Sequence, residues 1–274
     1  MKYNIFITGA TGMLANHFYD KAKYNYKPIL IHYKKEKINN KYIRLNYHNQ
    51  NEIKKFCLKY KPSSLIHTAG ITNVEICEKN KKKTLKINYE ITKNLTDICE
   101  QLGINFIYIS SDHLFDGNNY TGYSELSRTN PLNLYAETKI LSENYIKKKL
   151  KKYLIVRTNF FGKGNKFKKS FSDRIIASLK KNKKIKLFDD VYFNPISMNE
   201  LSKVVLKLIE IKKYGTFNIA TDQKINKYQF GIKISNYLNL NSKLIIKSKI
   251  DKMKLVLRPK SMFLKNRKIK KIIK

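Results

Sequence analysis

Short apolar runs alternate with segments of helical periodicity through the first two-thirds of the chain. Runs rich in β-branched and aromatic residues predict strands, whereas apolar residues three and four apart predict helices with one buried face. This alternation is typical of βαβ units and a parallel sheet. Strands are predicted at 4–8, 28–33, 42–46, 64–67, 105–110 and 153–157, and helices at 13–24, 50–59, 83–102 and 133–152.

The pattern becomes less regular after position 159. Helices are predicted at 170–181, 197–211 and 227–238, with short strands at 186–188 and 216–219. The expected fold class is α/β: a doubly wound parallel sheet of the Rossmann type with a smaller C-terminal substrate-binding lobe. We expect residues 1–159 to form the dinucleotide-binding domain and residues 160–274 to form the lobe, partly interleaved with it.

A glycine turn follows the first predicted strand. Gly9, Gly12 and Ala15 form a G-x-x-G-x-x-A pattern between a strand and an amphipathic helix. The first glycine permits a tight turn, the second lets a pyrophosphate approach the backbone, and the small third residue lets helix and strand pack closely. The positive end of the helix then faces the phosphates. A plain βα connection is the alternative, but the position in the chain favours a dinucleotide site.

Tyr135 and Lys139 stand four residues apart in a predicted helix, so both side chains can face one cleft. A nearby ammonium stabilises a phenolate, which makes the pair suitable as a proton donor for carbonyl reduction. In a lysine-rich chain the same spacing is also expected of solvated pairs. The neighbouring motifs therefore have to decide between the two interpretations.

The net charge of +37 changes this picture little. Of the 57 basic residues six are arginine, so 51 are lysine, and the lysines are spread along the whole chain. Nucleic-acid binders concentrate basic residues on one face, so no specific nucleic-acid partner is expected. The sequence shows no signal peptide or membrane-spanning run, which predicts a cytoplasmic protein without a membrane partner. Cysteines at 57, 77 and 99 have no metal-site spacing, and no metal is expected.

Three later segments are predicted at the carboxyl ends of strands, where doubly wound sheets bind ligands. They are 67–70 (HTAG), 110–112 (SSD) and 157–162 (RTNFFG). Ser111 precedes Tyr135 by 24 residues, across a predicted loop. Asn88 falls on the buried face of its predicted helix, so its amide should have a partner.

The motifs together resemble the extended short-chain dehydrogenases, in their dTDP-4-dehydrorhamnose reductase-like, sugar-nucleotide-binding branch. The matching stretches include ITGATGMLA, IHTAGITNVEICEKN, FIYISSDHLFDG, YSELSRTNPLNLYAETKILSE, IVRTNFFGKG and RPKSMFLKN. The resemblance implies that Ser111, Tyr135 and Lys139 are catalytic, with Asn88 anchoring a water or main-chain group behind Lys139. It implies cofactor contacts at Gly9, Thr11, Gly12, Met13, Leu14, Lys34, Thr68, Ala69, Gly70, Asn88, Tyr135 and Lys139, and substrate contacts at Thr72, His113, Asn159 and Arg258.

The resemblance implies an NAD(P)H-dependent reduction of a keto sugar nucleotide in surface polysaccharide precursor synthesis. Lys34 and Lys35 after the second strand favour NADPH over NADH. Arg258, before Pro259, is predicted to bind the substrate diphosphate. His113, Met262 and Lys265 depart from the family pattern, which leaves the sugar and base open. A sugar-nucleotide epimerase or dehydratase, or a non-catalytic NADP-binding regulatory subunit, is the alternative, and a homodimer is an open expectation.

Overall fold

The computed structural model describes residues 2–33 and 42–273. Within them, parallel strands form a seven-stranded sheet in the order β11-β6-β5-β4-β1-β2-β3. Its order reverses beside β1, whose two neighbours are β2 and β4, and such a reversal opens a crevice at the carboxyl ends of the strands. The strands are β1 (Asn4–Thr8), β2 (Lys27–His32), β3 (Tyr42–Arg44), β4 (Pro62–His67), β5 (Asn105–Ile109), β6 (Tyr153–Arg157) and β11 (Gly215–Asn218).

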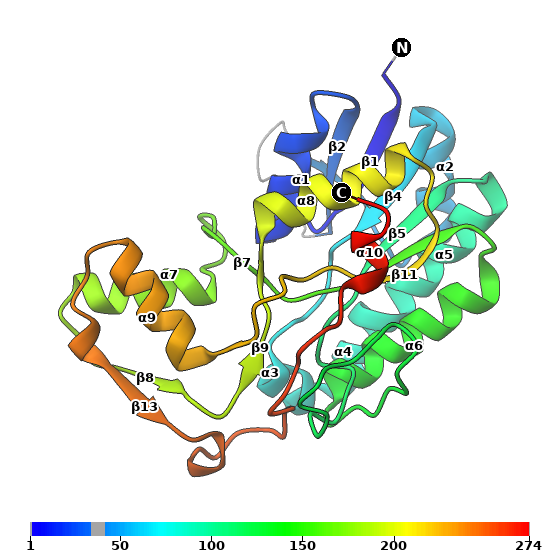
Figure 1. Cartoon of the computed structure of the whole chain (residues 1–274). Coiled ribbons are helices and arrows are strands. Elements are labelled where there is room, and N and C mark those ends of the chain that lie inside the picture. The colour runs from blue at the N-terminus through cyan, green and yellow to red at the C-terminus, as the bar shows by residue number, and fades with distance from the viewer. Residues whose placement is uncertain (1, 34–41, 274) are drawn as a thin grey trace.

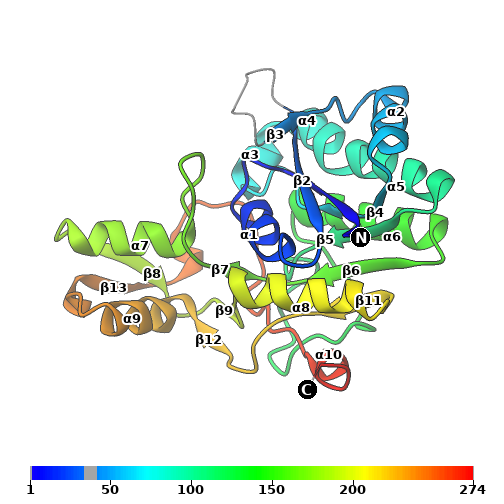
Figure 2. The same ribbon diagram turned by 90° about the horizontal axis from the view of Figure 1, so that it is seen from above.

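Helices cover both faces of this sheet because alternate strand residues point to opposite sides (Figures 1 and 2). In β1, Ile5 and Ile7 pack with α1 (Met13–Ala22) and α8 (Met198–Glu210). Phe6 points the other way, into a core shared with α2 (Gln50–Tyr60), α5 (Ile91–Leu102) and α6 (Leu134–Lys149). The predicted α/β fold of the Rossmann type is therefore confirmed.

A smaller lobe lies to one side of the sheet (Figure 1). It consists of α7 (Phe171–Lys180), β8 (Ile185–Phe188), α9 (Lys227–Tyr237) and β13 (Ile245–Ser248), with β13 parallel to β8 and a core of its own. Two short ladders join the lobe to the rest: β10 (Ile196–Ser197) with β7 (Phe160–Phe161), and β12 (Ile225–Asn226) with β9 (Tyr192–Phe193). Helix α8, strand β11 and α10 (Arg267–Lys270) return from this later part of the chain to the sheet.

The first six predicted strands and the helices between them agree with the structure to within a few residues. The predicted helix at 83–102 is instead composed of α4 (Lys81–Leu85), a π-helical turn (Lys86–Glu90) and α5. The predicted helix at 133–152 ends at Lys149, since Leu150 is extended. The strand predicted at 186–188 is present as β8. Helix α3 (Val74–Lys79) and the short strands β7, β9, β10, β12 and β13 were not predicted, because they are too short to show a period. In the described part of the chain, no helix has the length and apolar character needed to cross a membrane.

Candidate active site

The glycine turn after β1 has the geometry that close approach of a phosphate requires. Gly9 has a φ of +77°, and a Cβ added there would lie 2.8 Å from Thr68 Oγ1 and 2.9 Å from the Ala69 nitrogen. A Cβ at Gly12 would lie 2.9 Å from the Gly9 carbonyl oxygen. Helix α1 begins immediately afterwards, and Gly12 offers no side chain to cap it. The first-turn amides of α1 are therefore available to an anion.

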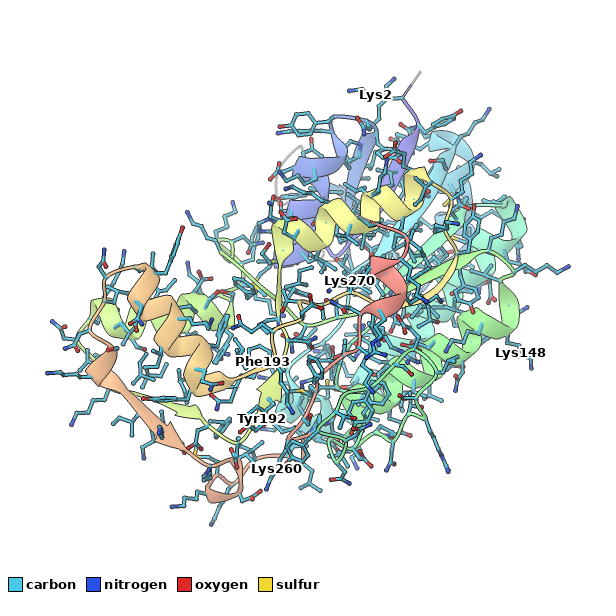
Figure 3. The ribbon with its side chains drawn as sticks, viewed as in Figure 1. Lys2, Lys148, Tyr192, Phe193, Lys260 and Lys270 are labelled. Atoms are coloured by element: carbon cyan, nitrogen blue, oxygen red, sulfur yellow. The ribbon has the colours of Figure 1, made fainter. Side chains whose placement is uncertain are left out.

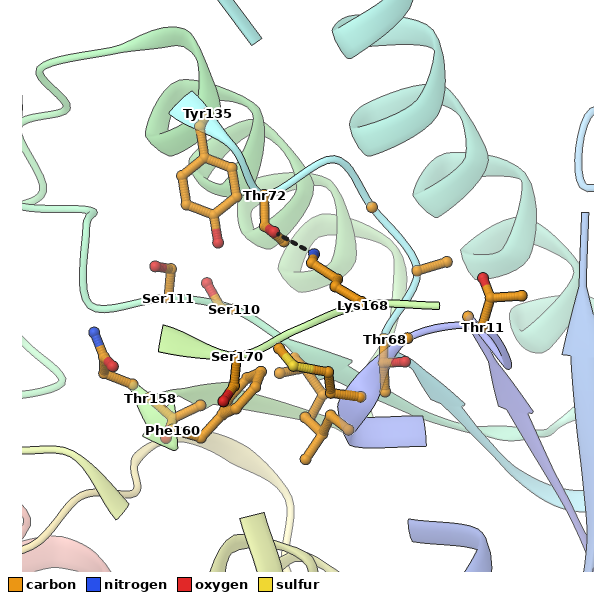
Figure 4. A pocket seen from close by; sticks show the side chains of 18 of the residues that line it. Thr11, Thr68, Thr72, Ser110, Ser111, Tyr135, Thr158, Phe160, Lys168 and Ser170 are labelled. Atoms are coloured by element: carbon orange, nitrogen blue, oxygen red, sulfur yellow. Dashed lines mark hydrogen bonds between the residues drawn. The ribbon is translucent and has the colours of Figure 1, made fainter. Parts of the chain in front are cut away.

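A cleft of about 520 Å³ opens at the carboxyl ends of the central strands, beside this turn (Figure 4). It brings together most of the predicted site residues from five separate segments of the chain. Arg258 and Asn88 do not line it, and Lys34 lies outside the described residues. The predicted residues that line the cleft are Gly9, Thr11, Gly12, Met13, Leu14, Thr68, Ala69, Gly70, Thr72, Ser111, His113, Tyr135, Lys139 and Asn159.

Helix α6 carries Tyr135 and Lys139 on the face that it turns toward the cleft. Two side chains cap the N-terminus of this helix: Asn133 Oδ1 accepts from the Ala136 N–H (3.0 Å), and Glu78 accepts from the Leu134 N–H (2.6 Å). Tyr135 is 8% exposed and Lys139 7% exposed. Figure 4 shows the Tyr135 hydroxyl directed toward Ser110 and Ser111. A solvated Tyr/Lys pair, the alternative interpretation, does not fit this burial.

The burial of these groups determines their protonation. Burial raises the pKa of Tyr135 to about 12, although the Ser111 hydroxyl opposes the rise, so the phenol carries its proton at neutral pH. Burial also lowers the pKa of Lys139 to about 8, and the Glu143 carboxylate opposes that shift. The Lys139 ammonium donates to the Ile109 carbonyl (2.9 Å) and lies 4.6 Å from the Tyr108 ring centroid. A proton donor and a cation are thus held at one edge of the cleft.

Asn88 lies in the π-helical turn and fixes the chain after β4. Its Oδ1 accepts from the Ile71 N–H (2.7 Å), while its Nδ2 donates to the Ile71 carbonyl (3.0 Å) and to Thr138 Oγ1 (3.3 Å). The partner predicted for this buried amide is therefore mainly a main-chain group. Because Thr138 precedes Lys139, Asn88 connects the 68–72 segment to α6. π-Helical turns are frequent at functional sites.

A buried ion pair lies one turn beyond Lys139 on the same helix. The Glu143 carboxylate accepts from Arg157 Nη2 (2.7 Å) and Nε (3.1 Å) and from the Ser110 hydroxyl (2.7 Å). The two charged side chains are 2% and 3% exposed. Burial opposes ionisation of Glu143, but Arg157 dominates and the pKa of the carboxyl is lowered. This pair ties α6 to β5 and β6 directly behind the cleft.

Of the predicted substrate residues, Thr72, His113 and Asn159 line the cleft, whereas Arg258 does not. Asp112 accepts from Asn159 Nδ2 (2.7 Å) and from the Ser111 hydroxyl (3.3 Å). The His113 ring packs edge-on to Tyr135 at 5.9 Å, and its buried Nδ1 has no hydrogen-bond partner among the described residues. Arg258 instead forms an ion pair with Glu75 of α3.

Sequence reasoning missed the segment 163–170, which crosses beside the glycine turn. Asn165 Nδ2 donates to the carbonyls of Thr11 (3.3 Å) and Gly12 (3.0 Å), and Lys168 Nζ donates to Thr72 Oγ1 (2.8 Å; Figure 4). Its lysines look like the many exposed lysines elsewhere, so the sequence contains no signal that distinguishes them. The cleft residues that were not predicted include His32, Tyr33, Tyr47, Phe167, Lys168, Lys169, Phe171 and Arg174.

The fold and the cleft define a nucleotide-binding protein of the Rossmann type. The model of the RmlD substrate binding domain family matches residues 1–274, and the chain belongs to that family.

The known proteins that resemble this chain are named after different activities. The crystal structure of dTDP-4-dehydrorhamnose reductase from Bacillus anthracis in complex with NADP superposes with a TM-score of 0.89 at 25% identity, covering 100% of this chain and 94% of that one. A probable low-salt glycan biosynthesis reductase, Agl14 of Haloferax volcanii, is 25% identical over 68% of this chain and 63% of its own length. The methionine adenosyltransferase 2 subunit beta of Xenopus laevis is 26% identical over 86% and 72%, respectively.

Proposed function

We propose that the chain is an NADPH-dependent reductase that converts the keto group of a sugar nucleotide into a hydroxyl group. The observation that carries the proposal is that Ser111, Tyr135 and Lys139 line one cleft together with the Gly9/Gly12 turn. At both glycines of this turn, an added Cβ would be too close to neighbouring atoms. Resemblance to a reductase crystallised with NADP supports the cofactor. We further propose dTDP-4-dehydrorhamnose reductase-like 4-keto reduction for surface polysaccharide precursors.

The residues suggest a division of roles in this reaction. When bound, NADPH supplies a hydride to the carbonyl carbon. Tyr135 gives its phenolic proton to the carbonyl oxygen, so that C=O becomes CH–OH. Ser111 donates a hydrogen bond to the same oxygen, and Lys139 stabilises the phenolate left on Tyr135 and holds the cofactor ribose. The raised pKa of Tyr135 suits this role, because the proton stays on the phenol until an alkoxide develops.

The assay that tests the proposal measures NADPH oxidation with a panel of 4-keto-6-deoxy sugar nucleotides. A reductase consumes one NADPH for each product molecule formed. Turnover without net cofactor oxidation would instead indicate the epimerase or dehydratase alternative. Binding of NADPH without turnover of any substrate in the panel would favour a non-catalytic subunit, an alternative kept open by the resemblance to the methionine adenosyltransferase subunit.

Arg258 is our proposed ligand for the substrate diphosphate. Its guanidinium is half-buried and already paired with Glu75, which leaves donors on the fork for a phosphate. Arg258→Ala should raise the KM for the sugar nucleotide about tenfold and leave the KM for NADPH unchanged. Steady-state kinetics with each substrate varied in turn checks this. An unchanged KM for the sugar nucleotide would place the diphosphate elsewhere.

A further inference from the structure

A lysine at the start of α9 lies where the lobe meets the sheet. Asn226 caps this helix by accepting from the Gln229 N–H (2.7 Å), and the Lys227 N–H donates to the Val191 carbonyl (3.1 Å). Pairing of β12 with β9 fixes the same region from the other side. Figure 3 shows Phe193 of β9 at this junction. The backbone of Lys227 is therefore held in one place.

The Lys227 ammonium has aromatic neighbours but no counter-ion. Its Nζ lies 3.3 Å from the Phe193 ring centroid and 5.3 Å from that of Phe171. Among residues 2–33 and 42–273, none forms a hydrogen bond or an ion pair with this group. Burial lowers its pKa to about 8, Asp112 opposes the shift, and Arg258 adds to it. A partly buried cation without a partner is costly, and an arriving anion would relieve that cost.

Lys227 does not itself line the cleft, but it lies directly behind Phe171, which does. The cleft is lined by Phe171, Asp112 and His113. The last two are close enough to Lys227 for electrostatic interaction with its ammonium group. Asp112 attracts the charge of Lys227 but forms no ion pair with it, and its carboxylate instead accepts from Asn159 and Ser111. The buried Nδ1 of His113, which lines the cleft, also has no hydrogen-bond partner among the described residues. An unpaired cation and an unpartnered ring nitrogen thus lie close enough to influence each other, and the same His113 ring contacts Tyr135.

We propose that Lys227 binds a phosphate oxygen of the substrate's diphosphate. The proposal rests on the proposed function and extends it by naming a cation outside the predicted site. Of two other cations near Lys227 or the cleft, Lys168 already donates to Thr72, whereas Arg258 pairs with Glu75 and keeps further donors for the same diphosphate. The influence of Arg258 on Lys227 shows that two cations approach each other here, which suits a group with two negative charges rather than a neutral sugar.

The test measures equilibrium binding by calorimetry, with the protein saturated with NADP⁺. The probes are dTDP and UDP, with thymidine and uridine as matched compounds that lack phosphate. Lys227→Met keeps the apolar stem against Phe193 and removes the charge, whereas Lys227→Arg keeps a charge. Lys233→Met is the control, because Lys233 is on the same helix but exposed, with a hydrogen bond to Gln223.

We expect Lys227→Met to weaken binding of the preferred nucleoside diphosphate about tenfold or more. Lys227→Arg should restore most of that affinity, and Lys233→Met should change it less than twofold. Affinities for NADP⁺ and for the nucleosides should stay the same in all variants. The proposal is overturned if Lys227→Met binds the diphosphate as the wild type does, if it loses NADP⁺ or nucleoside affinity equally, or if the wild type binds neither diphosphate. A protein that shows the expected loss but reduces no keto sugar would contradict the proposed reaction and leave this site intact.

Discussion

Tyr135→Phe should reduce kcat for keto sugar reduction by about 10²- to 10⁴-fold, because it removes only the transferable proton. The ring keeps its place between the cleft and the small cluster formed with Val74 and Cys77, so the fold should be unaffected. NADPH affinity should stay within about twofold of the wild-type value, since the phenol is expected to act on the substrate oxygen. Steady-state kinetics together with fluorescence titration of NADPH separates the two effects.

Tyr145→Phe is the matched control for this prediction. Tyr145 is on the same helix, but its hydroxyl donates to Asp97 (2.5 Å) on the helix that packs beside it, away from the cleft. Its loss should leave kcat near the wild-type value. If Tyr135→Phe retained near-normal turnover, the protein would be using another acid. Equal losses in the two variants would mean that the effect comes from helix packing.

The second large effect concerns stability. Glu143→Leu should lower the free energy of unfolding by about 3–5 kcal/mol, because it leaves the Arg157 charge buried and uncompensated. The Ser110 hydroxyl loses its acceptor in the same variant. Urea denaturation of the NADP⁺-free protein measures the change.

Two further variants test whether the cause is the unpaired charge. In Glu143→Leu/Arg157→Leu no buried charge is left alone, since Lys147, the other partner of Glu143, is partly exposed to solvent. The double variant should therefore be more stable than either single variant. Glu200→Ala removes an exposed carboxylate paired with Lys203, and should change stability by less than about 1 kcal/mol. Simple additivity of the two single changes in the double variant would show that the pair is not coupled.

The main sheet could be predicted from the sequence because its signals are local. Each central strand is a short apolar run between turn residues, as in Asn4–Thr8 before Gly9. The Gly9/Gly12 turn and the Tyr135/Lys139 spacing are likewise short-range patterns, and each can be explained by local backbone geometry. The predicted division at residue 159 stays a prediction. The structure shows α8 and β11 from the later part packed on the main sheet.

The remaining features depend on contacts between distant segments. Nothing within the sequence near Arg258 shows that Glu75, 183 positions away, pairs with it. Lys227 looks like any other of the 51 lysines until the fold places it over Phe193. The turn at Lys86–Glu90 adds a π-helical geometry that apolar periodicity does not reveal. The hydrophobic pattern of the sequence determines how the helices and the sheet of such a protein are layered. The positions and partners of the charged side chains in its cleft are determined by tertiary packing.

The measurement that tests the central claim most directly follows deuterium from NADPH labelled at C4 of the nicotinamide. With a 4-keto-6-deoxy sugar nucleotide as substrate, mass spectrometry of the product should show deuterium bound to a ring carbon and one NADP⁺ formed for each label transferred. Tyr135→Phe should form this labelled product at least 100-fold more slowly. A product without deuterium, formed while the NADPH concentration stays constant, would contradict the assignment as a reductase.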